Sequence, residues 1–515
     1  MLTTQAPSAP KQGRRGRVAA GIALGALLIV ALVGGLLYAL VFGHSTPSPN
    51  QGKSVLVLSK PDTERIAAVT LLTMIRTSDG KVLWQYHLAG DLAGGLSGTA
   101  DEQLRAGTAV HIVNGVVYFA EVLDARPDRP PLTTFSLTAL RADTGARLWQ
   151  HQMQATTLEV LGISDGVLVA QATTGTNYAV DALTATGYRA DTGALVWERR
   201  LAEHIGYGGS PDQLFDGILY VRQVGAALPL TTTALDAHTG KQLWQSTSQN
   251  VGFVAPIAAA DGVVVVEGGV PGGRGAPYAP SLSGVRERDG ALLWSHELSP
   301  SGGVPGTLAL PSFQASAGVL YFATNSPART DLELNALQIT HGTLLWHRQV
   351  TARQVITNQQ SSGGRGLVLA NGTLYLLYAL SAPASSPADY GLFVQAVRAS
   401  DGALGWGQIY HPGQGEDPGL AIVDGSAASA VVTWSTDSEH TPLLGLSAGD
   451  GTTLWHDQQT AYGELIADGK LLVFSVLPPP DNQFHEHLCA LQPGSGATLW
   501  CTAVDGLGNW VVVGP

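Results

Sequence analysis

The chain has 515 residues, of which only 13% are charged, and it contains 63 glycines and 28 prolines. This glycine content, with abundant Val, Leu, Thr and Ala, is typical of short strands joined by tight turns and argues against a helical bundle. The formal net charge is −12, and four cations in the first 42 residues leave a more acidic body behind them. Because phosphate binding depends on clustered cations, no nucleic-acid partner is expected.

The first 53 residues predict a membrane anchor. Residues 1–17 form a basic tail, and Val18–Phe42 is a run of 25 residues without a charge. A helix of this length exceeds the roughly 30 Å hydrocarbon core of a bilayer. Residues 43–53 are polar and contain proline, as expected of a linker. The positive-inside rule places residues 1–17 in the cytoplasm and the rest outside, as a single-pass protein of a bacterial cell membrane.

A cleaved signal peptide is the alternative to this anchor. Signal peptides usually have an apolar region of about 7–15 residues followed by an A-x-A-like site. The apolar run here is longer and ends in Tyr-Ala-Leu-Val-Phe-Gly-His, so we favour an anchor that is retained. Residues 54–515 then form a domain outside the membrane.

An internal repeat fills residues 54–515. Nine of the eleven tryptophans follow a turn such as Asp-Thr-Gly or Asp-Gly and a short segment, and successive copies lie 45 to 65 residues apart. This period is the size of one four-stranded propeller blade. The turn glycine provides the positive φ of a tight hairpin, and each Trp is expected to pack between neighbouring blades as a structural residue. These blade-docking residues are Trp84, Trp149, Trp197, Trp244, Trp294, Trp346, Trp406, Trp455 and Trp500.

A second hairpin lies in each of the eight later units. Its turn is a dipeptide that ends in glycine, such as Asn114-Gly115, Asp216-Gly217 or Asp468-Gly469, and an apolar strand follows it. The first unit lacks this hairpin, and the chain ends in an orphan strand, Asn509–Gly514. We therefore expect the C-terminal strand to pair with the N-terminal blade and close a ring, which removes exposed sheet edges.

The unit A-L-x-A-x-T-G-x-x-x-W, clearest at Ala139–Trp149 and Ala234–Trp244, resembles the tryptophan-docking repeat of the PQQ-like (quinoprotein alcohol dehydrogenase-like) propellers. The resemblance implies an all-β, PQQ-like β-propeller of four-stranded blades, here preceded by one transmembrane helix. Nine repeats are present, whereas rings of eight are commoner for this repeat, so eight and nine blades both stay open. The superfamily includes quinone-dependent dehydrogenases and proteins that only bind, so fold alone does not assign function.

Catalytic residues are not apparent. The dehydrogenases of this superfamily carry an adjacent cysteine pair beside PQQ and ligands for Ca²⁺, and no residue here matches that site. Asp143, Asp191 and Asp236 occupy repeat turns, where Asp is favoured for its conformation. His485 and His487 alternate on one strand without a third ligand nearby, so no metal site is expected. No catalytic residue, metal or cofactor is therefore predicted.

The only two cysteines, Cys489 and Cys501, flank the last turn of the chain. Opposed positions across a hairpin come within disulfide reach, and an oxidising location outside the membrane permits the bond. We favour a disulfide that staples the last blade, with two buried free thiols as the alternative.

These features predict a membrane-anchored, extracytoplasmic propeller that acts as a binding or scaffold module. Loops on one face of the ring would hold a protein or another ligand of the cell envelope. One alternative is a PQQ-dependent oxidoreductase that holds PQQ and Ca²⁺ centrally. The other is an extracytoplasmic sensor domain, which would need a separate signalling partner because only 17 residues lie inside.

Overall fold

The structure is a computed structural model. It describes residues 54–59, 71–93, 110–124, 133–176, 179–206, 213–224, 230–248, 252–270, 279–298, 313–325, 331–351, 367–380, 391–410, 419–423, 429–433, 443–457, 461–477, 485–504 and 510–513. The chain divides into two units, Met1–Gln51 and Gly52–Pro515, and every described residue belongs to the second. The predicted tail, transmembrane helix and linker lie outside the described residues. Within the described ranges, no helix has the length and apolar character needed to cross a membrane.

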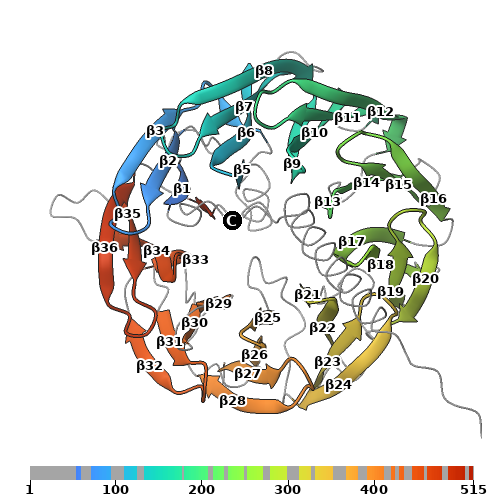
Figure 1. The fold of residues 1–515 in the computed structure, drawn as a ribbon. Helices are drawn as coiled ribbons and strands as arrows, with labels where there is room; N and C mark the ends of the chain where they lie inside the picture. The colour runs from blue at the N-terminus through green and yellow to red at the C-terminus, as the bar shows by residue number, and fades with distance from the viewer. Residues whose placement is uncertain are drawn as a thin grey trace, which may run out of the picture. The chain divides into compact units, whose positions relative to one another are not determined.

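The described strands form nine antiparallel sheets that follow one another around a ring (Figure 1). We number these sheets as blades 1 to 9. Blades 1 to 3 consist of β1 (Ser54–Ser59), β2 (Leu71–Arg76), β3 (Val82–His87) and β37 (Trp510–Val513); β4 (Asp91–Leu92), β5 (Val110–Val113), β6 (Val116–Asp124), β7 (Thr133–Arg141) and β8 (Arg147–Ala155); and β9 (Thr157–Ser164), β10 (Val167–Thr176), β11 (Ala179–Arg189) and β12 (Leu195–Gly206).

The next three blades have four strands each. They are β13 (Gln213–Phe215), β14 (Ile218–Val224), β15 (Leu230–Asp236) and β16 (Gln242–Ser248); β17 (Gly252–Ala260), β18 (Val263–Val270), β19 (Ala279–Arg286) and β20 (Leu292–Glu297); and β21 (Phe313–Ser316), β22 (Val319–Asn325), β23 (Asp331–Gln338) and β24 (Thr343–Thr351).

Blades 7 to 9 repeat the same plan. They are β25 (Leu367–Ala370), β26 (Thr373–Leu380), β27 (Gly391–Arg398) and β28 (Leu404–Tyr410); β29 (Gly419–Val423), β30 (Ser429–Thr433), β31 (Leu443–Ser447) and β32 (Thr453–Asp457); and β33 (Ala461–Ala467), β34 (Lys470–Leu477), β35 (His485–Leu491) and β36 (Thr498–Val504). The described residues thus contain eight four-stranded blades and a ninth, blade 2, which has five strands. Of the two blade numbers left open, nine is the one that the strand order supports.

The ring closes as the orphan strand predicts. The C-terminal strand β37 pairs antiparallel with β1, with Val55 opposite Val513 and Leu58 opposite Trp510. Blade 1 therefore joins the two ends of the domain. All of Val55, Leu56, Val57 and Leu58 are fully buried, as expected of an inner strand that is covered on both faces.

The nine repeat tryptophans link each blade to the next. Each indole Nε1 donates a hydrogen bond to a backbone carbonyl in the outer turn of the following blade. The acceptors, from Trp84 to Trp500 in chain order, are Ala142, Ala190, Ala237, Glu287, Ile339, Ala399, Ala448, Pro493 and Thr77. The last bond runs from blade 9 back to blade 1, so the chain of nine bonds closes on itself.

The outer turn explains why glycine ends each repeat motif. Gly145 has a φ of +68°, and a Cβ built on it would lie 2.8 Å from an indole carbon of Trp84. The turn therefore needs glycine both for its backbone conformation and for the close approach of the preceding blade's indole. The hydrophobic core lies between sheets in the same way: Val167 and Val169 of blade 3 pack in one cluster with Leu219 and Val221 of blade 4.

Candidate functional site

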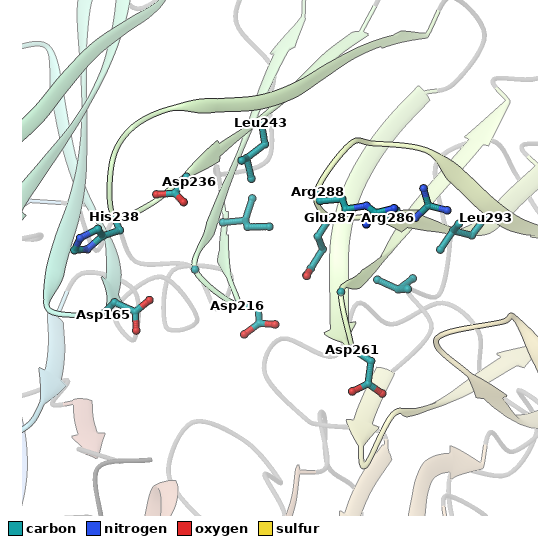
Figure 2. A pocket seen from close by; sticks show the side chains of 14 residues that line it. Asp165, Asp216, Asp236, His238, Leu243, Asp261, Arg286, Glu287, Arg288 and Leu293 are labelled. Carbon is teal, nitrogen blue, oxygen red and sulfur yellow. The ribbon is translucent and has the colours of Figure 1, made fainter. Parts of the chain in front are cut away.

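A pocket of about 640 Å³ opens where the turns of blades 3, 4 and 5 meet (Figure 2). Because strands alternate in direction, the turns that join the first to the second strand and the third to the fourth strand emerge at the same edge of each blade. We call this edge of the ring the turn face. The pocket is lined by Asp165, Asp216, Gly217, Ile218, Asp236, His238, Leu243, Asp261, Gly262, Val263, Arg286, Glu287, Arg288 and Leu293.

Three aspartates reach the pocket from equivalent inner turns. Asp165, Asp216 and Asp261 each precede a glycine in a two-residue turn, and their φ values are 46°, 44° and 52°. Asp tolerates this left-handed conformation better than most residues, and φ is positive at both turn residues, as in type I′ hairpins. The repeat thus places one carboxylate at the same point of three successive blades. None of the described residues forms a hydrogen bond or an ion pair with these three carboxylates.

The outer turns of blades 4 and 5 provide the other polar groups. Asp236 accepts hydrogen bonds from the backbone N and the hydroxyl of Thr239, both at 2.8 Å, so it stabilises its own turn. Arg286 and Arg288 lie 3.0 and 3.4 Å from a carboxylate oxygen of Asp289. Both guanidinium groups therefore already have an acidic partner, and that partner does not line the pocket.

Glu287 departs from the repeat. The residue at this position follows the third strand, and in the other eight blades it is Ala, Thr, Ile or Pro. The Glu287 side chain is only 7% exposed, and its Oε1 has no hydrogen-bond partner among the described residues. Burial, together with the nearby carboxylate of Asp216, raises the pKa of Glu287 from 4.5 to about 7. Figure 2 shows its carboxylate pointing into the pocket, on the side of Asp216 and Asp261.

A second buried oxygen without a partner belongs to Tyr220 on β14. Tyr118 and Tyr375, at the equivalent places in blades 2 and 7, donate their hydroxyl protons to the carbonyls of Ala190 and Ala448. The corresponding carbonyl in the next blade here is that of Glu287, and it accepts only the Trp244 indole. Tyr220 is 1% exposed, and its hydroxyl forms no hydrogen bond with any residue in the described part of the chain. Its pKa is raised, first by burial and then by the charges of Glu287 and Asp216.

The chemistry of this pocket favours a positively charged ligand. Five carboxyl groups line it, and the two guanidinium groups are engaged by Asp289. Buried polar groups in native proteins are nearly always satisfied, so those that are not need an explanation such as a ligand. Among the described residues, no group of three or more His, Cys, Asp or Glu side chains has the arrangement of a metal site.

The structure disperses the residues that the sequence singled out. The nine tryptophans lie in the outer strands between blades, away from the pocket lining. Asp143 and Asp191 are exposed in turns of blades 2 and 3, each beside an arginine two residues earlier, whereas Asp236 does line the pocket. The side chain of His487 lies on β35, and that of His485 is outside the described part of the molecule.

Cys489 and Cys501 lie opposite each other on β35 and β36 of blade 9. Their Cα atoms are 4.1 Å apart, and the structure joins them in a disulfide with an S–S distance of 2.06 Å. The bond bridges the last hairpin and does not contribute to the pocket.

Glu287 is the residue that the sequence interpretation missed. The signal was present: the outer turns read RADTG, DAHTG and QITHG in other blades but RERDG here, the one copy with an acid after its first residue. The turn aspartates were recognised only as turn formers. Their convergence with Glu287 depends on the packing of three neighbouring blades, which a repeat pattern does not reveal.

The ring of Trp-linked four-stranded blades defines this protein as a PQQ-like β-propeller with a polar pocket on its turn face. The chain belongs to the family described as outer membrane protein assembly factor BamB, whose model matches residues 70–187 and 183–382. The curated proteins contain no match to the chain.

Three solved structures with a similar fold are distant from this chain in sequence. BamB from Moraxella catarrhalis is 14% identical, with a TM-score of 0.40 and coverage of 71% of this chain and 92% of that chain. A quinohemoprotein alcohol dehydrogenase from Pseudomonas putida HK5 is 12% identical, with a TM-score of 0.38 and coverage of 74% and 69%. The dihydro-heme d1 dehydrogenase NirN is 12% identical, with a TM-score of 0.44 and coverage of 89% and 75%. At this divergence, none of them supports an argument about function.

The described residues do not fit the PQQ and Ca²⁺ site of the dehydrogenases. The two cysteines face each other across a hairpin and are not adjacent in the chain. The pocket carboxylates come from three blades, and no described group of side chains is arranged to hold a metal ion.

Proposed function

We propose that this protein is a membrane-anchored, extracytoplasmic binding module and that a protein partner docks on its turn face over blades 3 to 5. The observation that carries the proposal is the pocket around Glu287, which combines an acidic lining with two buried polar oxygens that have no partner. A buried polar oxygen without a hydrogen-bond partner lowers the stability of the folded chain. Residues that lower stability in this way are concentrated at functional sites.

Two further observations support this proposal. The uncharged run Val18–Phe42 follows four cations, which favours an anchor with the propeller outside. The family is described as an outer membrane protein assembly factor, which is consistent with a role in binding a protein partner. A propeller suits this role because many turns converge on one face of a rigid ring, and binding residues are commonly found on loops positioned by a rigid scaffold.

Site-specific photo-crosslinking in membranes tests the docking face. A photoreactive phenylalanine analogue replaces the exposed, pocket-lining His238 in one variant and the exposed Ser400, at the matching turn position of blade 7, in the other. We expect a discrete protein adduct from position 238 that is absent from position 400 and is lost when Glu287→Gln is added. The same adducts from both positions, or an adduct indifferent to Glu287→Gln, would contradict docking at this pocket.

The oxidoreductase alternative has its own test. The full-length protein is incubated with PQQ and Ca²⁺, and the reduction of an artificial electron-acceptor dye is measured with primary alcohols and aldose sugars. We expect no turnover above that of free PQQ, because the described residues do not fit a cofactor site. Robust turnover would overturn the binding-module proposal.

A further inference from the structure

We infer that the pocket beside Glu287 is a subsite for one basic side chain of a partner protein, with Glu287 as its principal acceptor. The inference deepens the proposed function and rests on it. It concerns a lysine or arginine side chain specifically, because the pocket combines acidic and apolar surfaces in one place.

The fold does not require an acidic side chain at position 287. In eight of nine blades a small or apolar residue is sufficient there, and the backbone carbonyl alone accepts the indole hydrogen bond. The Glu287 carbonyl accepts the Trp244 indole in the same way. The carboxylate therefore adds nothing to the link between blades 4 and 5, and its presence has no structural explanation.

Glu287 has no internal counter-ion among the residues that the structure describes. Within the same ranges, its buried Oε1 and the nearby Tyr220 Oη both lack a hydrogen-bond partner. The adjacent Arg286 and Arg288 point their charges at Asp289, and the Asp216 carboxylate adds a second negative charge close to Glu287. A buried charge without a partner is unfavourable, so a cation that enters the pocket gains from both carboxylates.

Apolar side chains form part of the pocket wall. Ile218, Leu243, Val263 and Leu293 line the same pocket as the carboxylates. Lysine and arginine bury an aliphatic stem along apolar surface while their charged end reaches a polar partner. A hydrated metal ion gains no favourable contact from apolar side chains, and the described side chains form no metal cluster. A basic side chain therefore matches the lining better than an inorganic cation does.

Short peptides added to the full-length protein test the subsite directly. The probes are acetyl-Ala-Lys-Ala-amide and acetyl-Ala-Arg-Ala-amide, and the control is the uncharged acetyl-Ala-norleucine-Ala-amide of similar length. Binding is measured by ligand-observed NMR at fixed ionic strength. We expect at least one basic peptide to bind about ten times more tightly than the norleucine peptide. Comparing the affinities of the lysine and arginine peptides shows whether the pocket prefers an ammonium or a guanidinium group.

Two variants separate Glu287 from the general acidity of the chain. Glu287→Gln keeps the size of the side chain and is expected to abolish the preference for basic peptides. Glu121→Gln alters another buried glutamate, 1% exposed on β6 and away from the pocket, and is expected to leave the preference unchanged. Glu287→Ala, which restores the commonest residue of the repeat, is expected to remove binding while the protein melts at the same or a higher temperature.

The outcomes distinguish this inference from the proposed function. Equal binding of the basic and norleucine peptides, or a preference that survives Glu287→Gln, would overturn the basic-side-chain subsite. Displacement of the basic peptides by Ca²⁺ but not by K⁺ at equal ionic strength would also overturn it, in favour of a metal site. A subsite that binds the peptides while position 238 gives no adduct in membranes would leave the subsite standing and would contradict the protein partner.

Discussion

Two interfaces of this propeller contain the same Tyr–Trp pair and differ in the residue whose backbone carbonyl accepts the indole hydrogen bond. Between blades 2 and 3, Tyr118 and Trp149 lie with ring centroids 6.1 Å apart, and both donate hydrogen bonds to the carbonyl of Ala190. Between blades 4 and 5, Tyr220 and Trp244 also lie 6.1 Å apart, but the carbonyl belongs to Glu287 and only the indole bonds to it. At the first interface the Tyr118 hydroxyl and the Trp149 indole both have an acceptor, whereas at the second the described residues offer no partner to Tyr220 Oη or Glu287 Oε1.

This difference shows which part of the repeat maintains the fold and which part is free to change. The Trp244 indole bonds to a backbone carbonyl, and any residue at position 287 provides that carbonyl. The Glu287 carboxylate points into the pocket (Figure 2), and the ring closes with an acidic residue at this position. A functional group can therefore be added to one blade at the cost of local stability.

The largest expected effect comes from removing the shared indole. Trp149→Ala and Trp244→Ala should each destabilise the propeller by about 3–5 kcal/mol, because a large buried side chain and its hydrogen bond are lost. Urea unfolding followed by far-UV circular dichroism measures the change. Similar losses at the two sites are expected, since both indoles are at least nine-tenths buried. A small loss at Trp244 alone would contradict an equal contribution of the two indoles to the stability of the ring.

Ala190→Glu transfers the acidic residue to the satisfied interface. Ala190 is 7% exposed, so the new carboxylate would be buried without a partner, and a loss of about 2–4 kcal/mol is expected. Ala190→Gln, of the same shape but uncharged, should cost less when both variants are compared at pH 8. If the two variants are equally stable at pH 8, charge burial does not explain the cost at this position.

Glu287→Ala should reveal the pH dependence of the cost at the native site. Below about pH 4.5 the carboxyl is protonated in the folded and unfolded chains alike, so it has no effect on the pH dependence. Between this pH and the raised pKa of about 7, only the unfolded chain ionises, and wild-type stability falls as pH increases. Above pH 7 the loss levels off, at no more than roughly 3 kcal/mol. The stability difference between the variant and the wild type, measured by urea unfolding from pH 4 to 8, should widen over this window.

The smallest expected effect concerns the two tyrosines. Tyr118→Phe removes a hydroxyl that donates to Ala190 and should cost about 1 kcal/mol, whereas Tyr220→Phe removes a hydroxyl without a partner and should be neutral or stabilising. Thermal melting of both variants in parallel gives the comparison. A clear loss of stability in Tyr220→Phe would show that its hydroxyl has a partner in solution.

Much of the fold followed from local chemistry. The glycine turns, the spacing of the tryptophans and the orphan Asn509–Gly514 segment predicted blades, their order and the closure of the ring, which the pairing of β37 with β1 confirms. These features were readable because each turn and strand depends on its own residues. The number of blades could not be predicted from local residues, because the geometry of ring closure decides whether all repeats enter the ring.

The sequence by itself determined that this chain is a Trp-linked, PQQ-like propeller, because the repeat encodes each hairpin and each interface separately. Only the tertiary structure decided that Asp216, Asp261 and Glu287, which the chain places in different turns, meet at one pocket. Only the structure distinguished Glu287 from an ordinary exposed turn residue, because burial and missing partners are properties of packing between blades. The physical reason is the same in both cases: turns form locally, whereas the charge environment of a turn is made by its neighbours in space.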